Sequence, residues 1–218
     1  MIPAMPRHAP QSPRNPTEGE ALRTEIAIAA ARMIAEEGAD YGSAKRRAAR
    51  QVLGDARVRG DILPDNAQVE DEVRAHQALF YGDTQPARLL HLRRMALELM
   101  AWLADYAPCL TGAVANGTAG EHSEIHLQLF ADNAKEVAVL LIDRNIRYDV
   151  SESNDFKGRA APIETLSFLW KHEGVHLAMY AVDDLRGALK AGAGGRVERL
   201  PLAAVRQLII DTEREIET

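Results

Sequence analysis

The spacing of the apolar residues changes near Pro108, and this change constrains the fold more than any other feature of the sequence. From Thr17 to Ala107 the apolar residues recur at the three- and four-residue steps of helices, and after Pro108 they form short alternating runs typical of strands. The sequence therefore predicts an α+β fold with a helical region at 17–107. A mixed β-sheet flanked by helices follows at 108–190, and a Gly-rich linker and a C-terminal helix at 191–218. Residues 1–16 read as a disordered tail.

Four helices are expected in the first half of the chain. Thr17 and Glu20 form a capping-box pattern, and Gly38 ends the helix that follows. The others are expected from Ser43 to Gly54, from Asn66 to Tyr81, and from Pro86 onward. Their predicted inward residues are Leu22, Ile26, Ala29, Met33 and Ile34 in the first, Val69, Val73 and Phe80 in the third, and Leu89, Leu92, Ala96, Leu99, Leu103 and Tyr106 in the fourth.

Five strands are expected in the second half, at 110–115, 123–130, 146–150, 164–170 and 175–182. The last two read as a hairpin that turns at 171–174. Helices are expected from Asp132 to Leu141, from Asp183 or Asp184, and from Pro201.

Charge and composition exclude several classes of function. The net charge of −6 offers no general attraction to nucleic acid or to an anionic membrane. Cys109 is the only cysteine, which excludes an internal disulfide, favours a reducing cytoplasm and suggests a buried, inert thiol. No apolar run approaches the roughly 20 residues that cross a bilayer.

The segment Gly112–Leu127 carries the clearest chemical signal. A glycine-marked turn leads into a predicted strand on which Glu124 and His126 stand two residues apart. Side chains at that spacing share one face of a strand, while Ile125, Leu127 and Leu129 share the other. A carboxylate and an imidazole beside a Gly-rich turn indicate a site for a metal ion and a phosphate.

This segment resembles the nucleotidyltransferase superfamily, which includes polymerase-beta-like enzymes and small bacterial nucleotidyltransferases. Gly112-Ala113 aligns with that family's Gly-Ser pair, and Ala115–Ala119 with its Ala-Arg-Gly-Thr-Ala. Ser123–Leu127 aligns with its Ser-Asp-Ile-Asp-Leu strand. The order of the surrounding elements extends the resemblance to roughly 80 residues.

The resemblance implies a nucleotidyltransferase that moves a nucleoside monophosphate from a nucleoside triphosphate to an acceptor with a divalent metal. It places the metal and the catalysis at Glu124, His126 and Asp149. It places the nucleotide against Gly112, Ala113, Asn116, Gly117, Thr118 and Ser123. Lys157 and Arg159 lie in the loop after the predicted strand that carries Asp149, within reach of an anion at the site. His126 replaces the family's second Asp, so manganese or zinc is expected to suit the site better than magnesium. Ala113 replaces the family's Ser and removes its hydroxyl contact to the nucleotide phosphate.

Two readings of function stay open on the sequence. One is an active nucleotidyltransferase, and the other is a non-catalytic member of that fold that binds a nucleotide, a nucleic acid or a protein. The basic cluster Lys45, Arg46, Arg47 and Arg50 is the candidate for nucleic-acid contact, although intramolecular ion pairs suit it better. His126 can meet His176 if their strands are neighbours. The sequence does not indicate an oligomeric state.

Overall fold

The computed structural model describes residues 17–54, 62–153, 162–188 and 199–216, and its fold is α+β. The helices are α1 (Glu18–Glu37), α2 (Tyr41–Leu53), α3 (Asn66–Phe80), α4 (Gln85–Trp102), α5 (Gly112–Asn116), α6 (Ala134–Asp143), α7 (Leu185–Ala188) and α8 (Leu202–Ile216), with short 3-10 turns at Ala104–Tyr106 and Val182–Asp184. The strands are β1 (Cys109–Thr111), β2 (Ile125–Phe130), β3 (Tyr148–Ser153), β4 (Ile163–Trp170), β5 (Glu173–Tyr180) and β6 (Leu200–Pro201).

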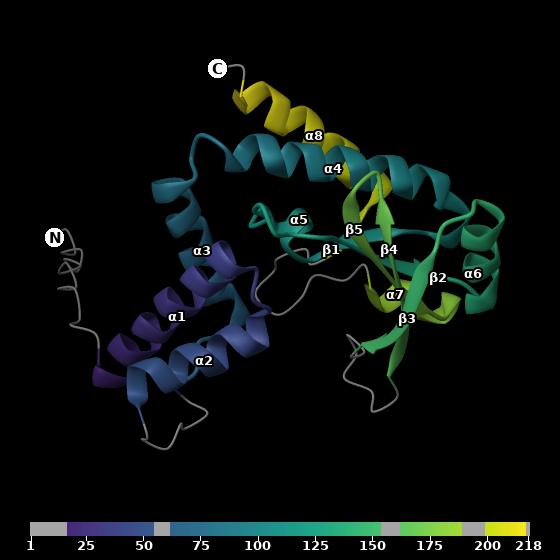
Figure 1. Ribbon diagram of the computed structural model, residues 1–218. Coiled ribbons are helices and arrows are strands. Elements are labelled where there is room, and N and C mark those ends of the chain that lie inside the picture. The colour runs from purple at the N-terminus through teal and green to yellow at the C-terminus, as the bar shows by residue number, and fades with distance from the viewer. Residues whose placement is uncertain (1–16, 55–61, 154–161, 189–198, 217–218) are drawn as a thin grey trace, which may run out of the picture.

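Helices α1, α2 and α3 form a separate helical unit, at the left of Figure 1, with its own small core. The capping box predicted at Thr17 and Glu20 is present, and Gly38 ends α1 in the left-handed conformation. Alanines on α1 and α2 let these helices approach closely, and Val69 and Val73 of α3 are fully buried against them.

The six strands form one mixed sheet in the order β3-β4-β5-β2-β1-β6. Strands β2 and β5 run parallel at its centre, and the other neighbouring pairs are antiparallel. Alternate residues of these strands are buried on one face of the sheet, among them Ile125, Leu127 and Leu129 of β2 and Val175 and Leu177 of β5. This face packs against helices and forms the main core.

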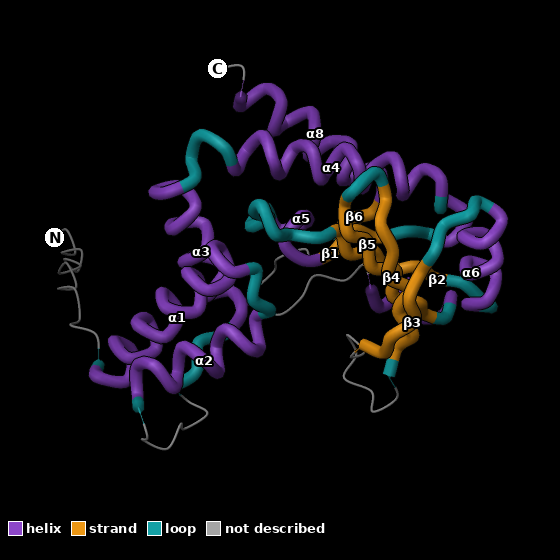
Figure 2. The backbone as a smooth tube through the Cα atoms, viewed as in Figure 1, coloured by secondary structure: helices purple, strands orange, loops and turns teal. Residues whose placement is uncertain are grey.

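Helix α4 belongs to that main core rather than to the helical unit. Its stripe of Leu89, Leu92, Ala96, Leu99 and Leu103 is buried, as predicted. Helix α8 runs beside α4 over the sheet (Figures 1 and 2). Because α8 covers a second side of α4, Arg93 is also buried and donates to the Thr212 hydroxyl (2.9 Å) and to the Val114 carbonyl (3.2 Å).

The other face of the sheet is open over its centre and has an apolar cluster at one end. There Phe130, Tyr180 and Ile163 cluster with Cys109, and Leu185 of α7 packs against them. Cys109 is buried, as predicted from its apolar surroundings, and the burial raises the pKa of its thiol to about 11. The thiol is therefore a core group and a poor nucleophile.

Several local predictions were wrong in instructive ways. Residues 112–116 form the short helix α5 instead of continuing a strand, because Gly112 takes a left-handed conformation (φ 69°) directly after β1. Phe80 is 63% exposed, and Gln77 takes the inward position one turn before it. Helix α2 begins at Tyr41 because the side chain of Asp40 caps it, and Asn133 rather than Asp132 caps α6. The predicted hairpin between β4 and β5 is confirmed, although its turn is confined to Lys171 and His172, both at positive φ.

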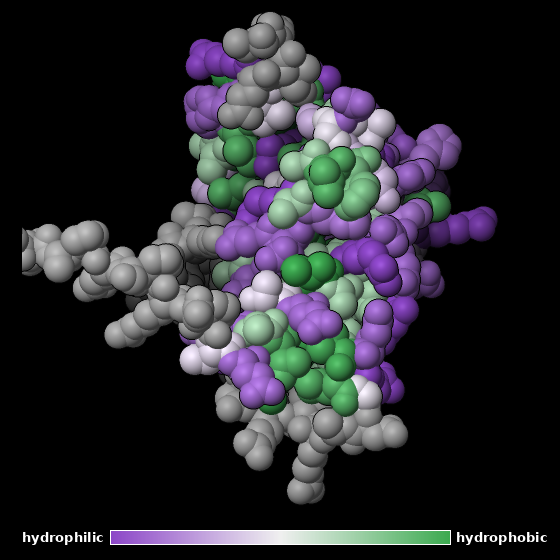
Figure 3. Space-filling model, turned by 90° about the vertical axis from the view of Figure 1, so that its left-hand side faces the viewer, coloured by the Kyte–Doolittle hydropathy of each residue, from purple (hydrophilic) through white to green (hydrophobic). Residues whose placement is uncertain are grey.

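No helix among the described residues is both long and apolar enough to cross a membrane. Large apolar side chains are nevertheless exposed at the end of α3, where Leu79 is 75% exposed beside Phe80. Figure 3 shows the side of the molecule that carries the helical unit, with apolar patches set among polar ones. The predicted tail at 1–16 and most of the Gly-rich linker lie outside the described residues.

Candidate metal centre

Glu124 and His126 stand on the open face of the sheet, as their spacing predicts. Ile125 and Leu127 between and after them are buried on the opposite face. Strand β5 runs parallel beside β2, and His126 lies directly opposite His176 in the register. Residues directly opposite on neighbouring strands share a face. The topology thus adds a second imidazole to the Glu124–His126 pair.

The three side chains converge closely enough to hold one metal ion. One ligand atom from each of Glu124, His126 and His176 lies within 4.8 Å of the other two. The Nε2 atom of His176 lies 2.6 Å from Oε2 of Glu124. The two imidazole rings stack with centroids 4.6 Å apart and an interplanar angle of 16°. A carboxylate and two imidazoles form a ligand set that suits first-row transition metals better than magnesium.

Ser167 of β4 holds the far nitrogen of His176. Its Oγ lies 2.8 Å from Nδ1 of His176, and the register places the two residues opposite each other. A hydroxyl can both donate and accept. When Nε2 of His176 gives its lone pair to a metal, Nδ1 carries the proton of the ring and donates a hydrogen bond to the hydroxyl oxygen of Ser167. Partners of this kind fix the orientation and tautomer of a ligating histidine.

Gly174 makes room for the carboxylate of Glu124. A Cβ atom built on Gly174 would stand 2.8 Å from Cδ and 2.9 Å from Cγ of Glu124, closer than real side chains approach. Gly174 is not in a left-handed conformation, so space and not backbone geometry explains its importance here. The Glu124 side chain lies across β5 because residue 174 has no side chain.

The surroundings of His126 favour its neutral form. Desolvation by the neighbouring protein lowers the pKa of His126 to about 4, and the adjacent His176 acts in the same direction, while Glu124 opposes both. A neutral imidazole is the form that binds a metal. The site therefore keeps this ligand ready at neutral pH.

Asp149 does not join these ligands, contrary to the expectation that its strand would neighbour that of Glu124. It lies on β3, and β4 and β5 separate β3 from β2. The register continues from His176 through Ser167 to Asp149, so Asp149 shares their face. With strands about 4.8 Å apart, its backbone stands roughly 14 Å from that of His126. His176 occupies the position beside β2 that Asp149 was predicted to occupy.

The turn that follows α5 is held by hydrogen bonds from the helices. Gln85 of α4 donates to the carbonyls of Gly117 (3.1 Å) and Ala119 (2.9 Å). Gln77 of α3 donates to the carbonyl of Thr118 (2.8 Å). The polar groups predicted to contact a nucleotide in this turn therefore lie within a network that joins the helical unit to the sheet.

The side chains of this turn take part in the same network. The Asn116 carboxamide accepts from the backbone N–H (3.0 Å) and the hydroxyl (2.7 Å) of Thr118, and Thr118 is buried. Ser123 accepts from the backbone N–H of Gly120 (2.9 Å).

Gly112, Gly117 and Ala113 occupy the remaining positions of the predicted nucleotide site. Gly112 and Gly117 both adopt positive φ, and a Cβ on Gly112 would lie 3.8 Å from Cδ2 of His126. The backbone of Gly112 therefore borders His126 of the candidate metal centre, and Ala113 follows it in the first turn of α5. Lys157 and Arg159, also predicted to reach an anion, lie outside the described residues.

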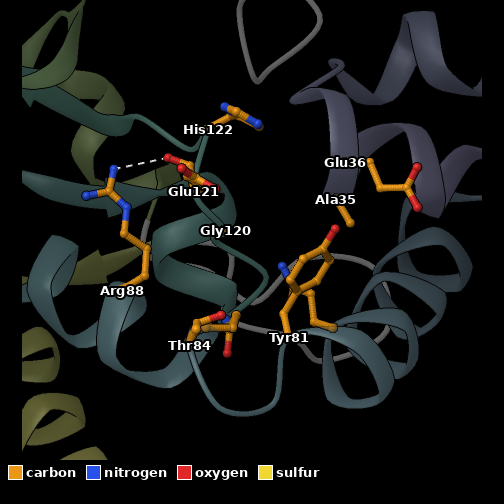
Figure 4. A pocket seen from close by; sticks show the side chains of 10 residues that line it. Ala35, Glu36, Tyr81, Thr84, Arg88, Gly120, Glu121 and His122 are labelled. Carbon is orange, nitrogen blue, oxygen red and sulfur yellow. Dashed lines mark hydrogen bonds between the residues drawn. The ribbon is translucent and has the colours of Figure 1, made fainter.

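A cavity of about 430 Å³ lies on the helical side of this turn (Figure 4). Tyr81 and Thr84 border it below, and Arg88 and Glu121 border it on the side of the sheet. Arg88 is already engaged, since it pairs with Glu173 (2.5 and 2.7 Å) and donates to the Glu121 carbonyl (3.2 Å). The cavity marks the junction between the two units.

The basic cluster on α2 is engaged within the chain. Arg47 pairs with Glu37 (2.8 Å), and Lys45 donates to Asn66 (2.8 Å). Arg46 donates to Ser43 (3.2 Å), and Arg50 donates to the Arg46 carbonyl (3.4 Å). These contacts agree with the intramolecular alternative weighed for the cluster.

Comparison with known proteins does not assign the chain to a family. No family model, no curated protein and no solved structure matches the chain. The site is thus interpreted from its own residues and from the motif resemblance.

Sequence reasoning missed two residues of this site. Ser167 and Gly174 carry no signal of their own in the sequence, because their importance depends on which residues lie opposite them. The hairpin pattern around 171–174 offered the one usable signal. The observed two-residue turn at Lys171 and His172 places Ser167 against His176, whereas the wider turn predicted at 171–174 would have placed Ser167 against Ala178.

Proposed function

We propose that this protein is a nucleotidyltransferase-like protein that binds a nucleotide through one divalent metal ion on the open face of its sheet. The observation that carries the proposal is the convergence of Glu124, His126 and His176, whose ligand atoms lie within 4.8 Å of one another. Glu124 and His126 are the residues that align with the acidic pair of the nucleotidyltransferase motif. Gly112 of the same motif borders His126.

One transition-metal ion suits this site better than two magnesium ions. Two-metal sites share carboxylates between ions about 3.5–4 Å apart. Glu124 is the single carboxylate of the converging group, and Asp149 lies three strands away. Manganese, zinc or cobalt accepts imidazole ligands more readily than magnesium does. The expected cofactor is therefore a single ion of this kind.

Three protein ligands leave coordination positions for oxygens of a bound phosphate. A metal there would lower the negative charge on the phosphates. Glu124, His126 and His176 would hold the ion, and Ser167 would hold the ring of His176. In the transfer reaction the acceptor hydroxyl would lose its proton to solvent and attack the α-phosphorus of a nucleoside triphosphate, and the bond from that phosphorus to the departing pyrophosphate would break. The buried, unpaired cysteine and the composition agree with a cytoplasmic protein.

A non-catalytic role is the second candidate, and one observation favours it. Among the described residues that converge on the proposed ion, Glu124 is the only carboxylate, so none remains to take the proton of an acceptor. In that case the protein would bind a nucleotide, a nucleic acid or a protein partner without transfer.

Pyrophosphate release separates the two candidates. Wild type, Glu124→Ala and His126→Asp would be assayed with each nucleoside triphosphate and with manganese, zinc, cobalt or magnesium. For an active enzyme we expect manganese to exceed magnesium in the wild type, and His126→Asp to shift the preference towards magnesium because it restores an oxygen ligand. Glu124→Ala should lose activity with every ion.

Two outcomes would contradict an active site at Glu124, the first by showing binding without catalysis and the second by showing catalysis elsewhere. A wild type that releases no pyrophosphate but gains thermal stability from nucleotide with metal is a binding protein, because stabilisation requires binding to the folded state. Release that Glu124→Ala leaves undiminished would show that the active site lies elsewhere.

A further inference from the structure

A hollow of about 680 Å³ opens from the metal ligands towards β3. Glu124 and His176 border it on one side, and Arg147 and Asp149 on the other. Gly174 and Leu169 lie between them, and Leu169 is 72% exposed. Gly174 and the exposed side chain of Leu169 therefore separate two charged ends of the hollow.

The sheet register sets the distance between these ends. Leu169 pairs with Gly174, and Arg147 lies one residue before Tyr148, which pairs with Phe168. Glu124, Gly174, Leu169 and Arg147 thus follow one another across the strands. With a strand spacing of about 4.8 Å, the backbones of Glu124 and Arg147 stand roughly 14 Å apart. One phosphate does not span that width, whereas a chain of two or three comes within reach of the long arginine side chain.

The charges on the hollow make anion binding depend on the metal. Without an ion, Glu124 and Asp149 contribute two negative charges and Arg147 one positive charge, and the imidazoles are neutral as ligands. A divalent cation changes this balance from −1 to +1. Arg147 is the one lysine or arginine among the described residues that line the hollow.

The hollow on the other side of His176 lacks such a counter-charge. It measures about 300 Å³ and lies between the metal ligands and the apolar end of the face. Its described lining includes Thr111, Gln128, Thr165 and Tyr180, and neither lysine nor arginine. The arginine nearest to this lining among the described residues is Arg199, whose Nε donates to the Gln128 carboxamide (2.9 Å).

We infer that the hollow on the β3 side binds a polyphosphate chain that runs from the metal ion across Gly174 towards Arg147. This inference rests on the metal site of the proposed function and names the part of the ligand that the site recognises. It assigns Arg147 to phosphate binding, a residue that the motif does not contain. It also makes Asp149 a repulsive neighbour of the ligand instead of a metal ligand.

The test uses the full chain and the manganese complex of inorganic tripolyphosphate, with free manganese in excess to keep the site occupied. Binding would be measured by calorimetry for wild type, Arg147→Gln, Asp149→Asn and the control Arg206→Gln, an exposed arginine of α8. We expect Arg147→Gln to weaken tripolyphosphate binding about tenfold or more, because charge-assisted bonds to phosphate are strong. Manganese affinity itself should not change, and the control should behave as wild type.

Asp149→Asn gives the clearest test of whether Asp149 repels the polyphosphate or binds the metal. Removal of its charge should tighten tripolyphosphate binding severalfold and leave manganese affinity unchanged. If Asp149 were a metal ligand, the same variant would weaken manganese binding, and the inference would be overturned. Tripolyphosphate binding that persists in EDTA, or that Arg147→Gln leaves unchanged, would overturn it too. A wild type that binds no manganese would instead overturn the proposed metal site.

Discussion

The segment Gly112–Leu127 has a turn half, which comprises α5 and the turn up to Ser123, and a strand half, which pairs with β5. The polar groups of the two halves meet different partners. In the turn, Gln77 and Gln85 satisfy backbone carbonyls, and Asn116 satisfies buried Thr118. On the strands, Glu124, His126 and His176 meet one another at the open face of the sheet. The first half joins the two units, and the second half can bind an ion.

Loss of His176 should have the largest effect on the strand half. His176→Ala removes one of three ligands, and we expect metal affinity to fall about 100-fold, or about 2.7 kcal/mol. Cobalt titration, followed by its absorption spectrum, measures this directly. His172→Asn is the matched control, because His172 lies on the hairpin turn at positive φ, which asparagine tolerates. Equal loss in both variants would mean that the hairpin, and not the ligand, controls affinity.

Loss of Gln85 should instead affect the turn half alone. Gln85→Ala leaves the carbonyls of Gly117 and Ala119 without their donor, and we expect the free energy of unfolding to fall by about 2 kcal/mol. Metal affinity should stay within twofold of wild type. Urea unfolding compares the variant with Gln207→Ala on the exposed side of α8, which should cost less than about 0.5 kcal/mol. A large loss of metal affinity in Gln85→Ala would break the division between the halves.

Gly174→Ala tests whether space over β5 positions Glu124. The added methyl meets the end of a flexible side chain rather than backbone, so the carboxylate should move while the fold remains. We expect metal affinity to fall about tenfold, or about 1.4 kcal/mol, with little change in the melting temperature. The control is Gly19→Ala, where a methyl group meets open space. Unchanged metal affinity in Gly174→Ala would remove the positioning role.

Ser167→Ala should have a similar or smaller effect through His176. Loss of a hydrogen-bond partner behind a ligating histidine typically costs about 10- to 100-fold in metal affinity, and an exposed site falls at the low end. Ser167→Thr keeps the hydroxyl and should restore most of the affinity. Cobalt titration of the three proteins decides this, and a threonine variant as weak as the alanine variant would argue for packing instead of hydrogen bonding.

The same two regions show which structural features the sequence predicted and which it did not. Local periodicity and capping predicted the helices other than α5, the strands other than β6, and the face shared by Glu124 and His126. Strand neighbours depend on long-range pairing, so Asp149 was placed too close, and His176 could be named only as a conditional partner. Buried polar residues were missed for the same reason. Gln77 and Arg93 look like surface residues until α5, the turn and α8 are seen to cover them.

The pH dependence of stability should show the smallest effect and belongs to the strand half. In metal-free protein the pKa of His126 is lowered to about 4, whereas in the unfolded chain it is near 6.5. The unfolded state therefore gains a proton as pH falls below about 6.5, and the folded state gains it only near pH 4. His126 contributes no pH dependence above that window and destabilises the fold progressively within it. Glu124, directly before β2, and His176 on β5 are the titratable groups of the described residues that face it. Urea unfolding in EDTA at pH 7.5, 5.5 and 4.5 would compare wild type with His126→Gln, and with His172→Asn as control. The stability of wild type relative to His126→Gln should decline from pH 7.5 to 4.5. A difference that stays constant over this range would show that the folded and unfolded states bind the His126 proton alike.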